Sequence, residues 1–323
     1  TTKILTALVA IREGDLNDVV TVSREAAYTE GSSMYLKVGE KLTLETLLYG
    51  LLLCSGNDAA VAIAETVGGS EDAFVAAMNA KAAELGMKNT LYTDSTGIAK
   101  DQYTSANDLA VLACDLLNKY PSVTDYTKLT YGLFKHESTQ EGDTEMVSSN
   151  NLTRGKFYQQ SDGLLVGSDS EFGYAMVGTV ADESTRSVAV IVGAADENYR
   201  AAEIRTLLEY GLTAFEYRQI ETKGTFVRKI NIKDGKEKKI KTEAAADFSV
   251  LLNKDDFDKI EKKVEITKTV QAPAKKGETV GEIVYMLEEK ELGRVEIVLS
   301  GDLENAGWFT RLIRKILSFF GLD

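Results

Sequence analysis

Hydrophobic and polar positions in the first third of the chain follow a helical period. Apolar residues recur at intervals of three and four, and glycine, serine or proline interrupts the pattern between runs. Ser70 before two acidic residues, and Gly86 after a last apolar turn, are typical of helix caps. The pattern predicts a short strand at residues 18–23 and five helices, over residues 3–13, 43–53, 58–67, 71–85 and 105–118.

The pattern changes to a strand period beyond residue 170. Residues 174–181 and 187–194 are apolar and β-branched, and the polar stretch 182–185 between them predicts a hairpin turn. A helix is expected over residues 200–217. A block of helices followed by strands and a closing helix predicts an α+β fold, in which a helical cluster packs on an antiparallel sheet.

The region after residue 218 is rich in Lys and Glu and carries short alternating runs, with Asp234-Gly235 as a favourable hairpin turn. Such runs occupy residues 226–232, 264–270, 279–286 and 293–299. They predict a small all-β domain. We therefore expect three parts: a domain over 1–217, a β-rich domain over 218–303 and a terminal helix over 304–323.

The last segment places aromatic and aliphatic residues on one helical face and cations on the other. The apolar face comprises Trp308, Phe309, Leu312, Ile313, Ile316, Leu317, Phe319 and Phe320, and the polar face comprises Arg311, Arg314, Lys315 and Ser318. This pattern in an acidic chain predicts that residues 306–323 lie on a membrane surface as an amphipathic helix. Docking on its own domain is the alternative. The sequence has no run of 18 apolar residues, so no spanning helix is expected.

Composition narrows the function classes. The 323 residues carry a formal charge of -13, which argues against nucleic acid as a partner because phosphate binding needs clustered cations. One histidine, His136, and no paired-His motif give little support for a zinc site or a Ser-His-Asp triad, and no metal or cofactor is expected. Cys54 and Cys114 are interpreted as two small buried apolar side chains, with a disulfide as the alternative.

Three segments carry candidate chemistry. Lys3 stands at a helix start, Ser55-Gly56-Asn57 lies between two apolar helices, and residues 161–168 precede a core strand. Taken singly, each has a plain interpretation: a solvated lysine, helix capping and a turn.

Together these segments resemble the serine D-Ala-D-Ala carboxypeptidases, which are low-molecular-weight penicillin-binding proteins with a β-lactamase/transpeptidase-like fold. Residues 1–7 look like the end of the S-x-x-K motif, and residues 31–40 are similar to the family's G-S-S-x-x-L-K-x-G-E stretch. Residues 55–59 match S-x-N with its flanks, and residues 103–110 resemble Y-S-S-A-x-D-x-A. Asp162-Gly163-Leu164 matches the residues that precede the K-T-G strand.

The resemblance implies a mechanism and a location. A nucleophilic serine would directly precede Thr1, outside this sequence, and Lys3 would take its proton. Ser55 and Asn57 would relay protons and bind the substrate amide, and the backbone N–H of Ser168 would complete an oxyanion hole. The implied substrate is the peptidoglycan stem peptide, and β-lactams are the implied inhibitors. The implied location is extracytoplasmic, peripheral on the outer face of the bacterial cytoplasmic membrane.

One motif departs from the family pattern. Leu165, Val166 and Gly167 stand where K-T-G is expected, so a cation and a hydroxyl that face the substrate carboxylate are absent. A lost charged hydrogen bond costs about 1.5–3 kcal/mol. Arg186, at the start of the next strand but one, is a candidate substitute cation.

Three interpretations follow from this departure. The chain is an active carboxypeptidase with an altered carboxylate site, a catalytically impaired homologue that binds peptidoglycan or organises cell-wall enzymes, or a related protein that binds or hydrolyses β-lactams.

Overall fold

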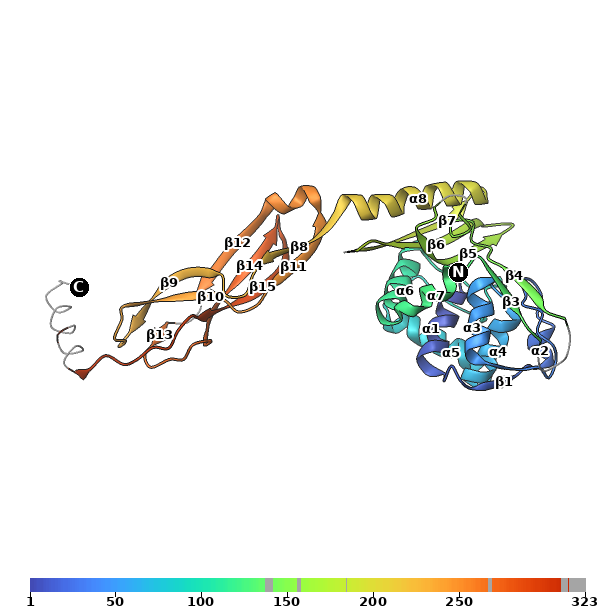
Figure 1. Ribbon diagram of the computed structural model, residues 1–323, viewed down its shortest axis with the longest axis horizontal. Helices are drawn as coiled ribbons and strands as arrows, with labels where there is room; N and C mark the ends of the chain where they lie inside the picture. Colours follow the sequence, from blue (N-terminus) through green and yellow to red (C-terminus); the bar gives the residue numbers. More distant parts are fainter. Residues whose placement is uncertain (137–141, 156–157, 184, 267–268, 309–312, 314–323) are drawn as a thin grey trace. The chain divides into compact units, whose positions relative to one another are not determined.

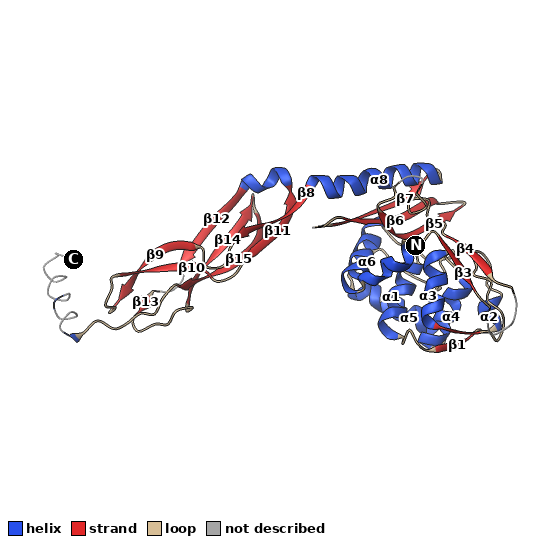
Figure 2. Ribbon diagram, in the orientation of Figure 1, coloured by secondary structure: helices blue, strands red, loops and turns tan. Residues whose placement is uncertain are grey.

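The protein is described by a computed structural model that covers residues 1–136, 142–155, 158–183, 185–266, 269–308 and 313. The chain divides into two compact units, Thr1–Thr213 and Ala214–Asp323. The first unit contains a helical cluster and a three-stranded sheet, and the second is built from strands (Figures 1 and 2).

The helical cluster of the first unit surrounds the helix that begins at Lys3. Its main helices are α1 (Lys3–Glu13), α3 (Leu44–Leu53), α4 (Asn57–Gly68), α5 (Glu71–Glu84) and α6 (Ala106–Lys119). Shorter turns are α2 (Arg24–Ala27), the 3-10 turn η1 (Pro121–Val123) and α7 (Thr124–Thr127). Leu5, Leu8, Leu47 and Leu51 are fully buried in the shared core, which is where the helical period of the sequence places them. The five predicted helices are confirmed to within one residue at each end.

An antiparallel sheet packs against this cluster. It has the order β5-β6-β7, with β5 (Ser161–Asp169), β6 (Gly173–Ala181) and β7 (Arg186–Ala194). The long helix α8 (Glu197–Ala214) covers the other face, where Ile204 and Leu208 pack with Met176 (Figure 2). The predicted helical cluster on an antiparallel sheet is confirmed.

Two observed elements differ from the predicted ones. The helix expected over residues 200–217 is shifted to Glu197–Ala214, because Phe215–Glu221 forms strand β8 and pairs with β11 (Phe248–Asn253). The short hairpin β3 (Tyr131–Phe134) and β4 (Thr144–Val147) was not predicted.

A second two-stranded pair is formed by β1 (Val19–Thr21), within the predicted strand at residues 18–23, and β2 (Lys41–Thr43). His136 links this pair of strands to the β3–β4 hairpin. The Nδ1 of His136 lies 3.0 Å from Oε1 of buried Glu40, and its Nε2 lies 2.8 Å from Oγ1 of Thr144.

The second unit contains a six-stranded sheet and the pair β11–β8. The order of the larger sheet is β12-β14-β15-β10-β9-β13. Its strands are β9 (Phe226–Lys233), β10 (Lys239–Ala244), β12 (Ile260–Ile266), β13 (Val270–Gln271), β14 (Thr279–Leu287) and β15 (Lys290–Leu299), and the 3-10 turn η2 (Lys254–Lys259) precedes β12. Val280, Ile283, Ile297 and Leu299 are fully buried in its own core. The predicted small all-β domain is confirmed.

The predicted amphipathic helix over residues 304–323 lies largely outside the described residues. Among the helices that are described, none is both long enough and apolar enough to cross a membrane. Both cysteines are free thiols. Cys54 is half-buried and Cys114 is exposed on α6, so the expectation that both are buried is wrong.

Candidate active site

Two side chains in the first turns of α1 form hydrogen bonds with the loop that follows residue 93. The Lys3 side chain is only 7% exposed, and its Nζ donates a hydrogen bond of 2.8 Å to the carbonyl of Thr96. Thr6, one helical turn later, donates from Oγ1 to the neighbouring carbonyl of Ser95 at 2.7 Å. Residues three apart share a helical face, so one face of α1 is bound to two consecutive peptides.

Asp94 shapes that loop. Its carboxylate accepts backbone N–H groups from Thr96, Gly97, Ile98 and Ala99 at 3.1, 2.6, 3.1 and 2.7 Å. These bonds fix the turn that presents the Thr96 carbonyl to Lys3. Sequence reasoning missed Asp94. The signal was an Asp-Ser-Thr-Gly turn, which is common in loops that carry no chemistry.

Burial lowers the pKa of Lys3 to about 8, because an ammonium group loses hydration inside the protein. The charges of Asp94, Cys54 and Asp58 act in the opposite direction. A lysine with this pKa is neutral in a substantial fraction of molecules near pH 8 and can accept a proton there.

The Ser55–Asn57 segment connects α3 to α4. Ser55 has a left-handed backbone with φ of 60°, and Asn57 is the first residue of α4. The Nδ2 of Asn57 donates to the carbonyl of Glu30 at 2.7 Å, while its buried Oδ1 has no partner among the described residues. An unpaired buried acceptor costs about 1–3 kcal/mol. A substrate N–H would remove that cost.

Asp58 connects this segment to the 31–40 stretch. Its carboxylate accepts from Oγ of Ser33 at 2.6 Å and from the backbone N–H groups of Met34 and Leu36 at 3.1 and 3.0 Å. Two motifs that are remote in sequence are thereby held together. Sequence reasoning noted Asp58 only as a flank of S-x-N, because its contacts depend on the tertiary fold.

Strand β5 brings the third motif to the start of α1, where the N-terminus lies beside it in Figure 1. A Cβ added to Gly167 would lie 3.3 Å from the backbone nitrogen of Thr1. Leu165 is 4% exposed and belongs to the core of the helical cluster, while half-buried Val166 packs with the residues under α8. Ser168 is exposed at the end of the strand. The site therefore has a glycine beside the start of α1, and the apolar Leu165 stands where the resemblance implies the ammonium group of a lysine.

Arg186 is not part of this arrangement, and its interpretation as a substitute cation is corrected. Its Nη1 lies 2.8 Å from Oδ2 of Asp162 and donates to Oγ1 of Thr179 at 2.8 Å. Asp162 is the second residue of β5, and Gly167 is five residues further along it. At about 3.3 Å per residue, five residues of strand span roughly 16 Å.

Arg200 is a cation that does reach Gly167, and sequence reasoning missed it. Its side chain extends from α8, is 3% exposed, and donates from Nη1 to the carbonyls of Gly167 at 3.1 Å and Ala175 at 3.4 Å. The guanidinium also lies over the Tyr174 ring, 5.6 Å from its centre. Its Nε is buried with no partner among the described residues. A single arginine near a helix start gives no sequence signal for this role.

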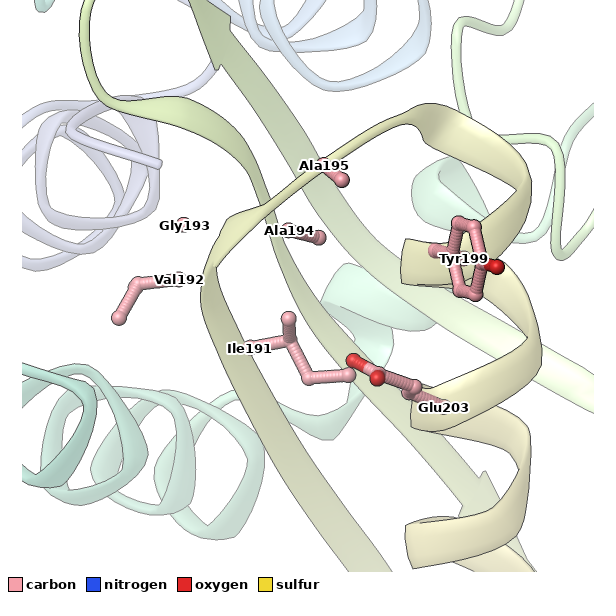
Figure 3. A pocket seen from close by; sticks show the side chains of 7 residues that line it. All are labelled: Ile191, Val192, Gly193, Ala194, Ala195, Tyr199 and Glu203. Carbon is pink, nitrogen blue, oxygen red and sulfur yellow. The ribbon is translucent and has the colours of Figure 1, made fainter.

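A hollow of about 220 Å³ lies elsewhere, between the end of β7 and α8 (Figure 3). It is lined by Ile191, Val192, Gly193, Ala194, Ala195, Tyr199 and Glu203. It contains none of the site residues above, and β6 separates β7 from β5. Within the residues that the structure describes, no group of three His, Cys, Asp or Glu side chains is placed to hold a metal ion.

Comparison with known proteins agrees with this geometry. Residues 1–196 match the family model for D-alanyl-D-alanine carboxypeptidase, and residues 215–305 match the model for the C-terminal domain of penicillin-binding protein 5. The D-alanyl-D-alanine carboxypeptidase DacF of Bacillus subtilis is 33% identical over 98% of this chain and 82% of its own length.

Solved structures show the same likeness. Penicillin-binding protein 5 of Haemophilus influenzae has a TM-score of 0.72 and 25% identity, and the match covers 94% of this chain and 89% of that one. Penicillin-binding protein 6B of Escherichia coli has a TM-score of 0.71 and 26% identity, covering 91% and 85%. Both matches extend across the two units.

Proposed function

Because the chain belongs to the D-alanyl-D-alanine carboxypeptidase family of serine hydrolases, we propose that it removes the terminal D-alanine from peptidoglycan stem peptides through an acyl-enzyme. The observation that carries this proposal is Lys3, which is buried, bonded to the Thr96 carbonyl and lowered in pKa to about 8. A lysine that only covered the surface would have none of these three properties.

The proposed reaction begins at the serine expected directly before Thr1. Neutral Lys3 takes the proton of that serine, whose Oγ attacks the carbonyl carbon between the two D-alanines. The C–N bond breaks as Ser55 passes its hydroxyl proton to the departing amine and receives in return the proton held on Lys3. Water then hydrolyses the ester, which releases the shortened peptide and restores the serine hydroxyl. The unpaired Oδ1 of Asn57 accepts a substrate N–H. The Ser168 N–H stabilises the oxyanion.

The site that binds the substrate carboxylate lacks two of the groups expected there. Leu165 and Val166 offer it neither a charge nor a hydroxyl, and Arg200 supplies positive charge from behind the Gly167 peptide. One lost charged hydrogen bond corresponds to about 1.5–3 kcal/mol, so we expect roughly ten- to hundredfold weaker carboxylate recognition than with an intact K-T-G. The impaired homologue is the competing proposal, and the same two residues support it.

The two proposals are separated by assaying the full-length protein. We expect D-alanine release from a pentapeptide and covalent labelling by a fluorescent penicillin, and we expect Lys3→Met to abolish both. A full-length protein that binds pentapeptide but neither releases D-alanine nor becomes labelled would refute the active carboxypeptidase.

We also propose that residues 306–323 hold the protein to the outer face of the cytoplasmic membrane. Support comes from the amphipathic pattern of the segment and from Trp308, which is 77% exposed. The test is deletion of residues 306–323, which should move the protein from the membrane fraction to the soluble fraction. Unchanged fractionation would refute the anchor.

A further inference from the structure

The hairpin of β9 and β10 in the second unit carries lysines on one face. In the strand register Lys239 faces Asn231, Ile240 faces Ile230, and Lys241 faces Lys229. Ile230 and Ile240 are buried in the core, so the alternate positions point outward. We call this outward surface the cationic face; it comprises Lys229, Lys233, Lys239 and Lys241, all exposed.

The cationic face holds a pair of like charges in place of stabilising ion pairs. Like charges directly opposite on neighbouring strands repel, and Lys229 stands directly opposite Lys241. None of the four ammonium groups forms an ion pair within the part of the chain that the structure describes. Residues 226–241 hold seven Lys or Arg and two acidic residues, although the whole chain carries a charge of -13. An outside anion would relieve this repulsion.

The hairpin turn lies where the chain leaves the domain. The carbonyl of Asp234 accepts the backbone N–H of Ala306 at 2.8 Å, and the N–H of Lys236 donates to the carbonyl of Glu304 at 2.9 Å. Gly235 also pairs with Asn305 as an isolated bridge. Figure 1 shows the hairpin beside this last stretch of chain. Residues 306–323, which carry the membrane pattern, therefore begin at the turn of the cationic hairpin.

We propose that the cationic face of the β9–β10 hairpin binds the anionic headgroups of a lipid membrane. The proposal rests on the membrane association proposed above for residues 306–323 and adds a second, electrostatic contact to it. A basic residue near an anionic membrane strengthens binding about fivefold at moderate salt, and the effect decays within a Debye length. Proximity to residue 306 favours a lipid surface over a soluble anionic polymer.

The test measures binding of the full-length protein to vesicles. One set contains phosphatidylglycerol and phosphatidylcholine in equal parts, and the other contains phosphatidylcholine alone. The test variant is Lys229→Gln/Lys239→Gln/Lys241→Gln. The control variant is Lys254→Gln/Lys263→Gln/Lys290→Gln, which changes three exposed lysines of the same unit and alters the net charge equally.

We expect the test variant to bind phosphatidylglycerol vesicles about a hundredfold more weakly than wild type, from about fivefold for each of three lysines. The control variant should bind them like wild type, and binding to phosphatidylcholine vesicles should be the same for all three proteins. Equal loss in the two variants, or no loss in the test variant, would overturn the proposal.

Two further measurements distinguish a lipid surface from a soluble anionic polymer, and the cationic-face proposal from the proposed enzyme activity. If soluble polyphosphate binds the cationic face while vesicle binding is unchanged in the test variant, the partner is an anionic polymer and the lipid proposal is wrong. D-alanine release is measured in parallel and should be unchanged in the test variant. A protein without that activity whose vesicle binding still depends on the three lysines would refute the proposed enzyme and support the cationic face.

Discussion

Gly31 faces the amide of Asn57, and replacing it with alanine should impair acylation far more than folding. A Cβ added at Gly31 would lie 2.4 Å from Nδ2 of Asn57. Nonbonded heavy atoms approach to about 3.5 Å, so the amide would have to move by roughly 1 Å. The 2.7 Å bond from Nδ2 to the carbonyl of Glu30 holds the amide in its present position. Gly31→Ala therefore displaces a group that we assign to the substrate.

The magnitude follows from two separate effects. Gly31 has φ of +94°, where a residue with a side chain costs about 1–2 kcal/mol of folding free energy. A displacement of about 1 Å in a group that positions substrate costs about a hundredfold in rate, or roughly 2.7 kcal/mol of activation free energy. We expect the second-order rate constant of penicillin acylation to fall about a hundredfold.

Gly39→Ala is the matched control. Gly39 has φ of +80° in the same 31–40 stretch, but a Cβ there meets nothing within 4 Å. Both variants should lose similar stability in thermal unfolding, whereas only Gly31→Ala should acylate slowly. Equal acylation rates in the two variants would refute the assigned position of Asn57 against substrate.

Three other predictions concern charge at the site. Acylation by penicillin should rise with pH and reach half of its maximum near pH 8, because deprotonation of Lys3 creates the base; a flat profile between pH 6 and 10 would contradict this. Asp94→Asn should move that midpoint to lower pH, since the Asp94 charge raises the pKa of Lys3, whereas a smaller rate with an unmoved midpoint would leave Asp94 a purely structural role. Arg200→Gln should raise KM for pentapeptide about tenfold, while Arg186→Gln should not, and the opposite ranking would restore Arg186 to the carboxylate site.

The sequence predicted the parts of this molecule that depend on local pattern. The helix over residues 3–13 was predicted to the residue, because its apolar spacing and terminal glycine are local signals. Lys3, Ser55, Asn57 and Gly167 were identified from motifs. The sequence could not predict which side chains contact these motif residues in the folded protein. Asp94, Asp58 and Arg200 act through contacts made across the fold, and their own neighbours in sequence look ordinary.

The correction at Arg186 has the same origin. Arg186 was considered because it is a cation at the start of the second strand of the predicted hairpin. Strand register decides otherwise, since antiparallel pairing puts Arg186 opposite Ala181, near the beginning of β5. Sequence distance says nothing about which end of a neighbouring strand a residue reaches.

The hydrogen bond from Lys3 to the Thr96 carbonyl also sets the direction in which the lone pair of neutral Lys3 points. A neutral amine has two N–H bonds and one lone pair in tetrahedral array. With one N–H held by the Thr96 carbonyl at 2.8 Å, rotation about the Cε–Nζ bond is restricted. The lone pair must then point away from the loop at residues 94–99, in one of two remaining orientations. The carbonyl therefore persists as a partner through both protonation states of Lys3, and it orients the proton acceptor before any substrate arrives.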